Sequence, residues 1–179
     1  MKLRLHDSLS GETREFEPQE PGVAKVYTCG PTVYLPQHIG NFKTFVFEDV
    51  LCRALALSGL RVRQVMNITD VGHMTVDSLA DAGGEDKMEL SARREGKSPL
   101  EIPAGITERF HRDRRALRIR DAEVYPKATD HIPEMIDIIG KLVARGHAYA
   151  VGGNVYFEVS TFPGYGKLSK NTIESLVAG

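Results

Sequence analysis

The apolar residues of the first half of the chain follow a strand, helix, strand order. The short apolar run from Val23 to Tyr27 indicates a buried strand. From Phe42 to Ser58 the apolar side chains recur at helical spacing, and Gly59 predicts the end of that helix. The segment from Leu60 to Met66 predicts a second strand. A strand, a helix and a strand within about 45 residues form a βαβ unit, whose usual arrangement is a parallel sheet.

Beyond Asp70 the pattern becomes more polar and more helical. The clearest element is a helix from about His131 to Arg145, which has a regular apolar stripe, Pro133 in its first turn and Gly146 as its stop. Around it the sequence predicts a hairpin of residues 2–6 and 13–17, a loop over 76–85, helices over 86–96 and 99–119, a connector over 124–130, a hairpin of 148–151 and 155–159, and a loop-rich tail over 162–179.

Composition narrows the class of protein. Among 179 residues, 41% are hydrophobic and 26% are charged, which is typical of a globular protein that folds around a core. No apolar run approaches the roughly 18 residues of a membrane helix, and the first residues lack a signal peptide, so we expect a cytoplasmic protein. A formal net charge of -1 excludes a globally basic nucleic-acid binder and leaves only a local patch for RNA contacts.

The turn between the first strand and the helix carries the candidate chemistry. Gly30 and Pro31 break the strand, and the helix begins near Ile39 or Gly40. Unpaired N–H groups and the positive end of the dipole make such a helix start a binding site for phosphate. Cys29 and His38 place a thiol and an imidazole in the same turn. The pattern therefore predicts a site for a nucleotide and for a group that a thiolate or a metal recognises.

Several segments, in this order, resemble the N-terminal part of cysteinyl-tRNA synthetase, a class I aminoacyl-tRNA synthetase. The segment from Tyr27 to Tyr34 resembles the strand end of the cysteine pocket in that family, and His38-Ile39-Gly40-Asn41 resembles its form of the class I HIGH motif. Further matching segments are Asn67 to Asp70, Pro126 to Ile132, Gly146 to Tyr149 and Tyr165 to Ser169. The resemblance covers nearly the whole chain.

The resemblance implies a fold and a division into domains. It implies an α/β fold, namely a partial Rossmann-like nucleotide-binding domain of the HUP type with an inserted helical and hairpin connective segment. Residues 1–75 would form the first half of the ATP- and cysteine-binding domain together with the N-terminal hairpin. Residues 76–179 would form a helical segment and the start of the connective insertion.

The resemblance also implies site residues and ligands. His38 and Asn41 would be the catalytic residues, and together with Gly40 they would bind ATP. Cys29, Gly30 and Thr69 would bind the substrate cysteine, with Cys29 also a zinc ligand. The implied ligands are ATP with Mg²⁺, zinc, cysteine and tRNA(Cys).

The chain departs from the family pattern in two places. Val71-Gly72-His73-Met74 stands where many members carry an acidic pair and a lysine. The chain also stops before the later zinc ligands, the KMSKS loop, the second half of the nucleotide fold and the anticodon-binding region. We therefore expect a fragment whose zinc site is incomplete, whose activity alone is weak or absent, and on which a C-terminal half packs.

Two other functions stay open at this point. A cysteine ligase that charges an amino-sugar alcohol, of the mycothiol type, shares this N-terminal half. A truncated relative that binds cysteine, a nucleotide or a partner without turnover is the non-enzymatic alternative. Structural interpretations also compete at single residues, because Thr69 is a plausible strand-end cap and most free cysteines are small buried hydrophobes. Cys52, in the predicted helix, is assigned to the core.

Overall fold

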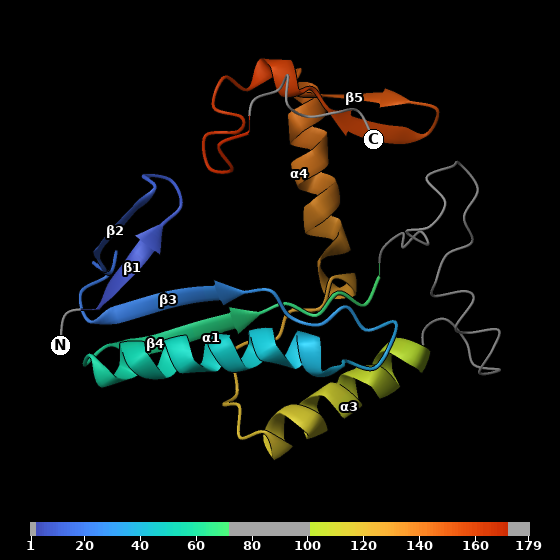
Figure 1. The fold of residues 1–179 in the computed structure, drawn as a ribbon. Coiled ribbons are helices and arrows are strands. Elements are labelled where there is room, and N and C mark those ends of the chain that lie inside the picture. Colours follow the sequence, from blue (N-terminus) through green and yellow to red (C-terminus); the bar gives the residue numbers. More distant parts are fainter. Residues whose placement is uncertain (1–2, 72–100, 172–179) are drawn as a thin grey trace. The chain divides into compact units, whose positions relative to one another are not determined.

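The computed structural model describes residues 3–71 and 101–171, with the side chains of 101 and 102 left out (Figure 1). The loop expected over 76–85 and the helix expected over 86–96 lie outside these residues. The chain divides into two compact units. One comprises Met1–Leu3 and Glu17–Asp130, and the other comprises Arg4–Phe16 and His131–Gly179.

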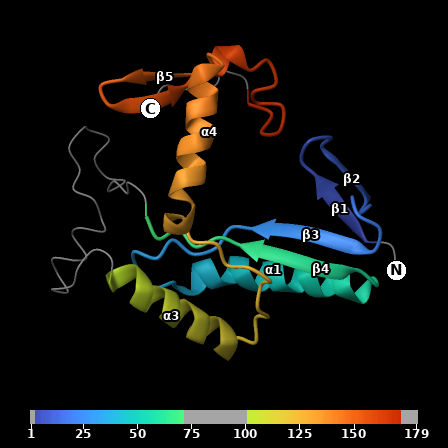
Figure 2. The same ribbon diagram turned by 180° about the vertical axis from the view of Figure 1, so that it is seen from behind.

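The first unit is built on the predicted βαβ arrangement. Strand β3 (Val23–Thr28) and strand β4 (Arg61–Met66) pair in parallel, from Val23 opposite Arg61 to Thr28 opposite Met66. Helix α1 (Ile39–Leu57) connects them and lies along one face of the pair (Figures 1 and 2). Both strands point the same way, so their carboxyl ends meet beside the start of α1.

An extended connector follows the free edge of β4. Val124 pairs in parallel with Val65, and Lys127 pairs in parallel with Ile68. The Val124 carbonyl accepts a hydrogen bond from Met66 N (3.1 Å), and the Pro126 carbonyl accepts one from Ile68 N (2.8 Å). Pro126 has no N–H to donate, which hides this strand-like pairing from a reading of the sequence.

The core of this unit lies between α1, β4, helix α3 (Glu101–Ala116) and the start of the connector. Phe110 of α3 stacks on Phe42 of α1, with ring centroids 6.1 Å apart, and meets Phe45 edge-on at 5.1 Å. Such aromatic pairs contribute about 1 kcal/mol each beyond their buried area. The other members of this core are Met66, Ile119 and Ala122.

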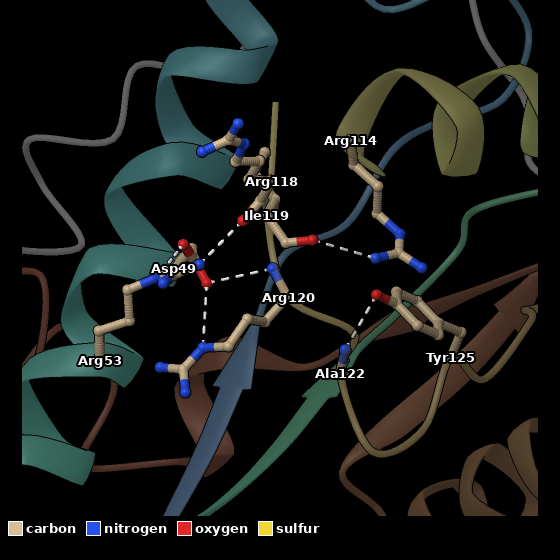
Figure 3. Close-up of polar contacts among 8 residues, drawn as sticks. All are labelled: Asp49, Arg53, Arg114, Arg118, Ile119, Arg120, Ala122 and Tyr125. Carbon is tan, nitrogen blue, oxygen red and sulfur yellow. Dashed lines mark hydrogen bonds and ion pairs between the residues drawn. The ribbon is translucent and has the colours of Figure 1, made fainter. Parts of the chain in front are cut away.

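Helix α3 ends at Ala116, three residues before the predicted end. Arg118 adopts a positive φ of 59°, which an α-helix cannot continue. Figure 3 shows what holds the turn beyond it. Arg53 of α1 donates to the Arg118 carbonyl at 2.8 Å, and Arg114 donates to the Ile119 carbonyl at 3.3 Å.

Asp49 of α1 fixes the same segment from the other side. Its carboxylate accepts hydrogen bonds from Arg53 Nε at 2.6 Å and from the backbone N–H of Arg120 at 3.2 Å (Figure 3). The Arg120 side chain lies 3.5 Å from the same carboxylate. The arginines that gather near the end of α3 are thus partly used to join α1 to this turn.

The second unit contains two hairpins and a helix. Strands β1 (Arg4–Asp7) and β2 (Glu12–Glu15) pair antiparallel, as do β5 (Ala148–Val151) and β6 (Asn154–Phe157). Helix α4 (Ile132–Ala144) follows a short 3₁₀ turn at Thr129–His131, and another such turn, Val159–Thr161, follows β6. Both predicted hairpins and the predicted helix are confirmed. In the part of the chain that the structure describes, no helix is long and apolar enough to cross a membrane.

Candidate active site

The carboxyl ends of β3 and β4 stay joined beyond the strands themselves. Thr32 pairs in parallel with Thr69, whose N–H donates to the Pro31 carbonyl at 3.0 Å. The Thr69 carbonyl in turn accepts from Val33 N at 3.0 Å. This pairing extends the contact between the two strand ends past the Cys29–Gly30 turn, toward the start of α1.

Gly30 occupies a position that no larger residue fits. A Cβ at Gly30 would lie 1.7 Å from the backbone oxygen of Asn67 and 2.8 Å from the Met66 side chain. The nearer obstacle is a backbone atom, which no side-chain rotation can move, and the Met66 side chain is packed in the core. The glycine is therefore required by close packing of two backbones, in addition to the substrate-binding role that the family resemblance implies.

Asn67 links this turn to Thr69. Its Oδ1 accepts the Gly30 N–H at 3.1 Å, and its Nδ2 donates to Thr69 Oγ1 at 3.1 Å. The sequence analysis quoted Asn67 only as part of a matching segment and gave it no role. Nothing in a single sequence signals a contact between residues that are 37 positions apart.

His38 and Asn41 close the start of α1 reciprocally. His38 is the N-cap residue, and its Nδ1 accepts the Gly40 N–H at 3.0 Å. Asn41 Oδ1 accepts the His38 N–H at 3.1 Å. These bonds satisfy two groups that a helix start otherwise leaves unpaired, which is the capping-box arrangement with unusual residues.

This cap indicates which nitrogen of a neutral His38 ring carries the proton. An imidazole nitrogen that accepts a hydrogen bond carries no proton, so the proton of the neutral ring sits on Nε2. Nε2 is then a hydrogen-bond donor. A Cβ at Gly40 would lie 2.8 Å from His38 Cε1 and 3.0 Å from Nδ1. Because Gly40 has no side chain, the space beside it is free for the His38 ring.

A surface pocket of about 460 Å³ joins these groups. Cys29, Gly30, His38 and Asn41 all line it, so four of the predicted site residues share one cavity. Gly40 is bonded to the His38 ring, and Thr69 is paired with the lining residue Thr32. The remaining described lining residues are Pro31, Thr32, Tyr34, Leu35, Pro36, Gln37, Thr44 and Phe45.

The two cysteines differ in exposure, and the prediction that Cys52 lies in the core is confirmed. Cys52 is buried in α1, and burial raises the pKa of its thiol. Cys29 is exposed at the pocket, and its Sγ lies 3.8 Å from the Gly30 carbonyl. Within residues 3–71 and 101–171, no three His, Cys, Asp or Glu side chains gather to hold a metal. The described residues therefore offer zinc one thiol at the pocket and no complete site.

Helix α1 also carries a buried carboxyl group. Glu48 of α1 is 8% exposed, and burial raises its pKa, while a hydrogen bond with Thr28 acts in the opposite direction. Gln64 Nε2 donates to Thr28 Oγ1 at 3.1 Å, so the hydroxyl proton of Thr28 is left for Glu48. Among the described residues, Glu48 Oε2 has no hydrogen-bond partner. Sequence reasoning missed this group because a glutamate in a helix is usually exposed, although Glu48 has helical spacing to the buried residues Cys52 and Leu55.

Asp70 has a structural task in this structure. Its carboxylate accepts from Thr129 N at 3.0 Å and from Thr129 Oγ1 at 2.6 Å. Two hydrogen bonds to a carboxylate hold the end of the connector at the strand end. This contact makes Asp70 an anchor for the connector.

Similarity to known proteins agrees with this geometry. Residues 15–179 match the family described as tRNA synthetases class I (C) catalytic domain. The chain is 49% identical over 179 residues to a cysteine--tRNA ligase of Treponema denticola, and 51% identical over 172 residues to one of Chlorobium luteolum. These matches cover 100% and 96% of this chain. The chain spans 36% and 35% of those relatives, about a third of their length.

A solved structure supports the fold. A leucyl-tRNA synthetase (agnB2 LeuRS) of Agrobacterium radiobacter K84, solved with tRNA and LeuAMS, superposes with a TM-score of 0.57 at 19% sequence identity. The match covers 74% of this chain and 16% of that one. The expected partial Rossmann-like α/β fold is thus confirmed. From the family match and the relatives, the chain belongs to the cysteine--tRNA ligase family of class I aminoacyl-tRNA synthetases.

Proposed function

We propose that this chain supplies the first part of the adenylation site of a cysteine--tRNA ligase. In the first reaction an oxygen of the cysteine carboxylate attacks the α-phosphorus of ATP, and the bond to pyrophosphate breaks. In the second, the 3′-terminal hydroxyl of tRNA(Cys) attacks the carbonyl of cysteinyl-adenylate and AMP leaves. The first reaction requires positioning and charge stabilisation, which Mg²⁺ on the phosphates assists, and no general base from the protein.

The start of α1 is the proposed ATP site. The Nε2–H of His38 and the amide NH₂ of Asn41 are the donors available to phosphate or ribose oxygens, because the other polar atom of each side chain is used in the cap. Gly40 leaves room for the His38 ring. Donors held in advance stabilise charge as it develops, and losing one costs roughly 10²–10³ in rate.

Cys29, Gly30 and Thr69 are the proposed contacts for substrate cysteine. Cys29 would supply one thiolate ligand to zinc, which would bind the substrate thiolate and select cysteine over serine, since zinc prefers sulfur. All the proposed site residues lie within residues 1–75, and 76–179 would begin the connective insertion. The relatives are longer than this chain. The further zinc ligands would come from that additional length, which would pack against this chain.

The observation that carries the proposal is the shared pocket. Membership of the family indicates a ligase, and Cys29 and His38 line the same cavity. A relative that merely kept the fold would not need an exposed thiol and a donor imidazole in the lining of one pocket.

The test is cysteine-dependent exchange between ATP and pyrophosphate, with Mg²⁺ and zinc present. We expect weak exchange from the 179-residue chain, and loss of it in Cys29→Ala and in His38→Ala. Cys52→Ala is the matched control, because that thiol is buried in α1 away from the pocket lining, and it should keep the exchange.

Nucleotide binding is measured separately, by NMR titration with ATP and Mg²⁺. Shifts at Gly40 and Asn41 support the ATP site even where exchange is below detection. A folded chain with neither shifts nor exchange would favour a fragment whose site is completed by further chain, or a non-catalytic relative. If exchange occurs, attachment of cysteine to tRNA or to an amino-sugar alcohol distinguishes the two acceptors.

A further inference from the structure

Asn67 stands at the junction of the two strand ends. Gly30 packs so closely on it that a Cβ would lie 1.7 Å from the Asn67 backbone oxygen. The Asn67 side chain bonds Gly30 N on one side and Thr69 Oγ1 on the other. A single half-buried amide thus touches both segments that supply the proposed cysteine contacts.

The direction of these hydrogen bonds is fixed by chemistry. The backbone N–H of Gly30 only donates, so the amide must turn its oxygen toward Gly30. Its NH₂ group then faces Thr69 and donates to Oγ1. A hydroxyl that accepts in this way keeps its own proton for another acceptor.

We propose that Asn67 is a positioning residue that holds the Cys29–Gly30 turn in place and makes Thr69 a hydrogen-bond donor toward the bound amino acid. This inference rests on the proposed function, since it concerns the same pocket. An amino-acid ligand has acceptors in its carboxylate and thiolate, whereas its ammonium group only donates. A Thr69 hydroxyl that donates would therefore bind the carboxylate or the thiolate of the ligand and not its ammonium group.

Two substitutions separate the two tasks of Asn67. Asn67→Asp keeps an oxygen that accepts from Gly30 N but replaces the donor facing Thr69 by an acceptor. The Thr69 hydroxyl then donates to the new carboxylate and not to the ligand. Asn67→Ala removes both contacts. Asn154→Asp, in the exposed strand β6, is the control for an added negative charge.

The first readout is the exchange rate of the Gly30 amide proton in the 179-residue chain without ligand, followed by NMR. We expect Asn67→Asp to keep the slow exchange of the original chain, and Asn67→Ala to speed it at least tenfold. Unchanged exchange in Asn67→Ala overturns the role in holding the turn. This readout is independent of any binding of cysteine.

The second readout is the dissociation constant for L-cysteine, from NMR titration in the presence of zinc. We expect Asn67→Asp and Thr69→Val each to weaken binding by about tenfold, since each removes one hydrogen bond to the ligand. In the double variant the losses should not add, because both act through the same hydroxyl. Additive losses, or an equal loss in Asn154→Asp, overturn the role in orienting Thr69.

The two proposals fail in different ways. If the original chain binds neither ATP nor L-cysteine, the proposed function fails for this chain, and so does the role of Asn67 in orienting Thr69 toward a bound amino acid. The exchange rate of the Gly30 amide proton still decides whether Asn67 holds the turn. If the chain binds L-cysteine and Asn67→Asp binds it equally well, the proposed function stands and the orienting role is wrong.

Discussion

At the scale of single residues, the His38 ring requires a glycine at position 40. A Cβ there would lie 2.8 Å from His38 Cε1, so Gly40→Ala must displace the imidazole. We expect the variant to lose the His38 cap and about 1 kcal/mol in the free energy of unfolding, measured in urea. The ¹⁵N signals of His38 should also change from those of an Nε2–H tautomer.

Gly105 provides the matched control for that substitution. It lies within α3, and a Cβ there meets nothing within 4 Å. Gly105→Ala should stabilise the chain by about 0.5–1 kcal/mol, because alanine loses less backbone freedom on folding. Equal stabilisation by Gly40→Ala would contradict the steric role given to the ring.

Glu48 should make stability depend on pH. Burial raises its folded-state pKa above the ordinary value of 4.5, so the unfolded chain ionises first as pH rises. Stability is therefore full below that value and falls as pH rises toward the folded pKa. Glu48→Gln removes this loss, so urea midpoints should favour the variant more at pH 7 than at pH 4. The same difference at both pH values would show that Glu48 does not titrate this way.

At the scale of elements, Arg114 joins α3 to the turn that follows it. Its side chain is 3% exposed, donates to the Ile119 carbonyl and to His111 Nδ1, pairs with Asp121, and lies 5.4 Å from the Tyr125 ring centre. Arg114→Met keeps the bulk and removes these bonds. We expect a loss of about 2 kcal/mol in the free energy of unfolding.

The neighbouring Arg115 is the control, since its side chain is exposed at the same end of α3. Arg115→Met should change the free energy of unfolding by less than about 0.5 kcal/mol. Similar losses in both variants would mean that charge near the helix end, and not the buried contacts, stabilises this turn.

Elements with a local signal were predictable, and those made by distant contacts were not. Apolar spacing predicted β3, α1 and β4, and the turn between them marked Cys29 and His38 as candidate site residues, which line one pocket. The pairing of Val124 with Val65 joins residues far apart in the sequence, and Pro126 disguises it. Asn67 was missed for the same reason, because its contact with Gly30 joins distant parts of the chain, whereas Glu48 was missed because a glutamate in a helix is usually exposed.

At the scale of the whole molecule, the two units differ in how much they bury. The first has an aromatic core around Phe110, whereas Ala148 is the one buried apolar side chain of the second unit among its described residues. Helix α4 buries none of its side chains within the described chain, and its exposed apolar residues are Ile132, Met135, Ile136, Ile138, Ile139 and Val143. Apolar burial is the main source of stability, so the second unit should be the weaker.

Hydrogen exchange tests this difference, because amides in weakly held regions exchange through local opening. We expect the slowest amides of the chain in β3, β4 and α1, and exchange at least tenfold faster in α4 and in the β5–β6 hairpin. Gly40→Ala serves as an internal probe, since it should speed exchange at the start of α1 and leave α4 unchanged. Equal protection of α4 and β4 would mean that the second unit gains stability from contacts other than apolar burial.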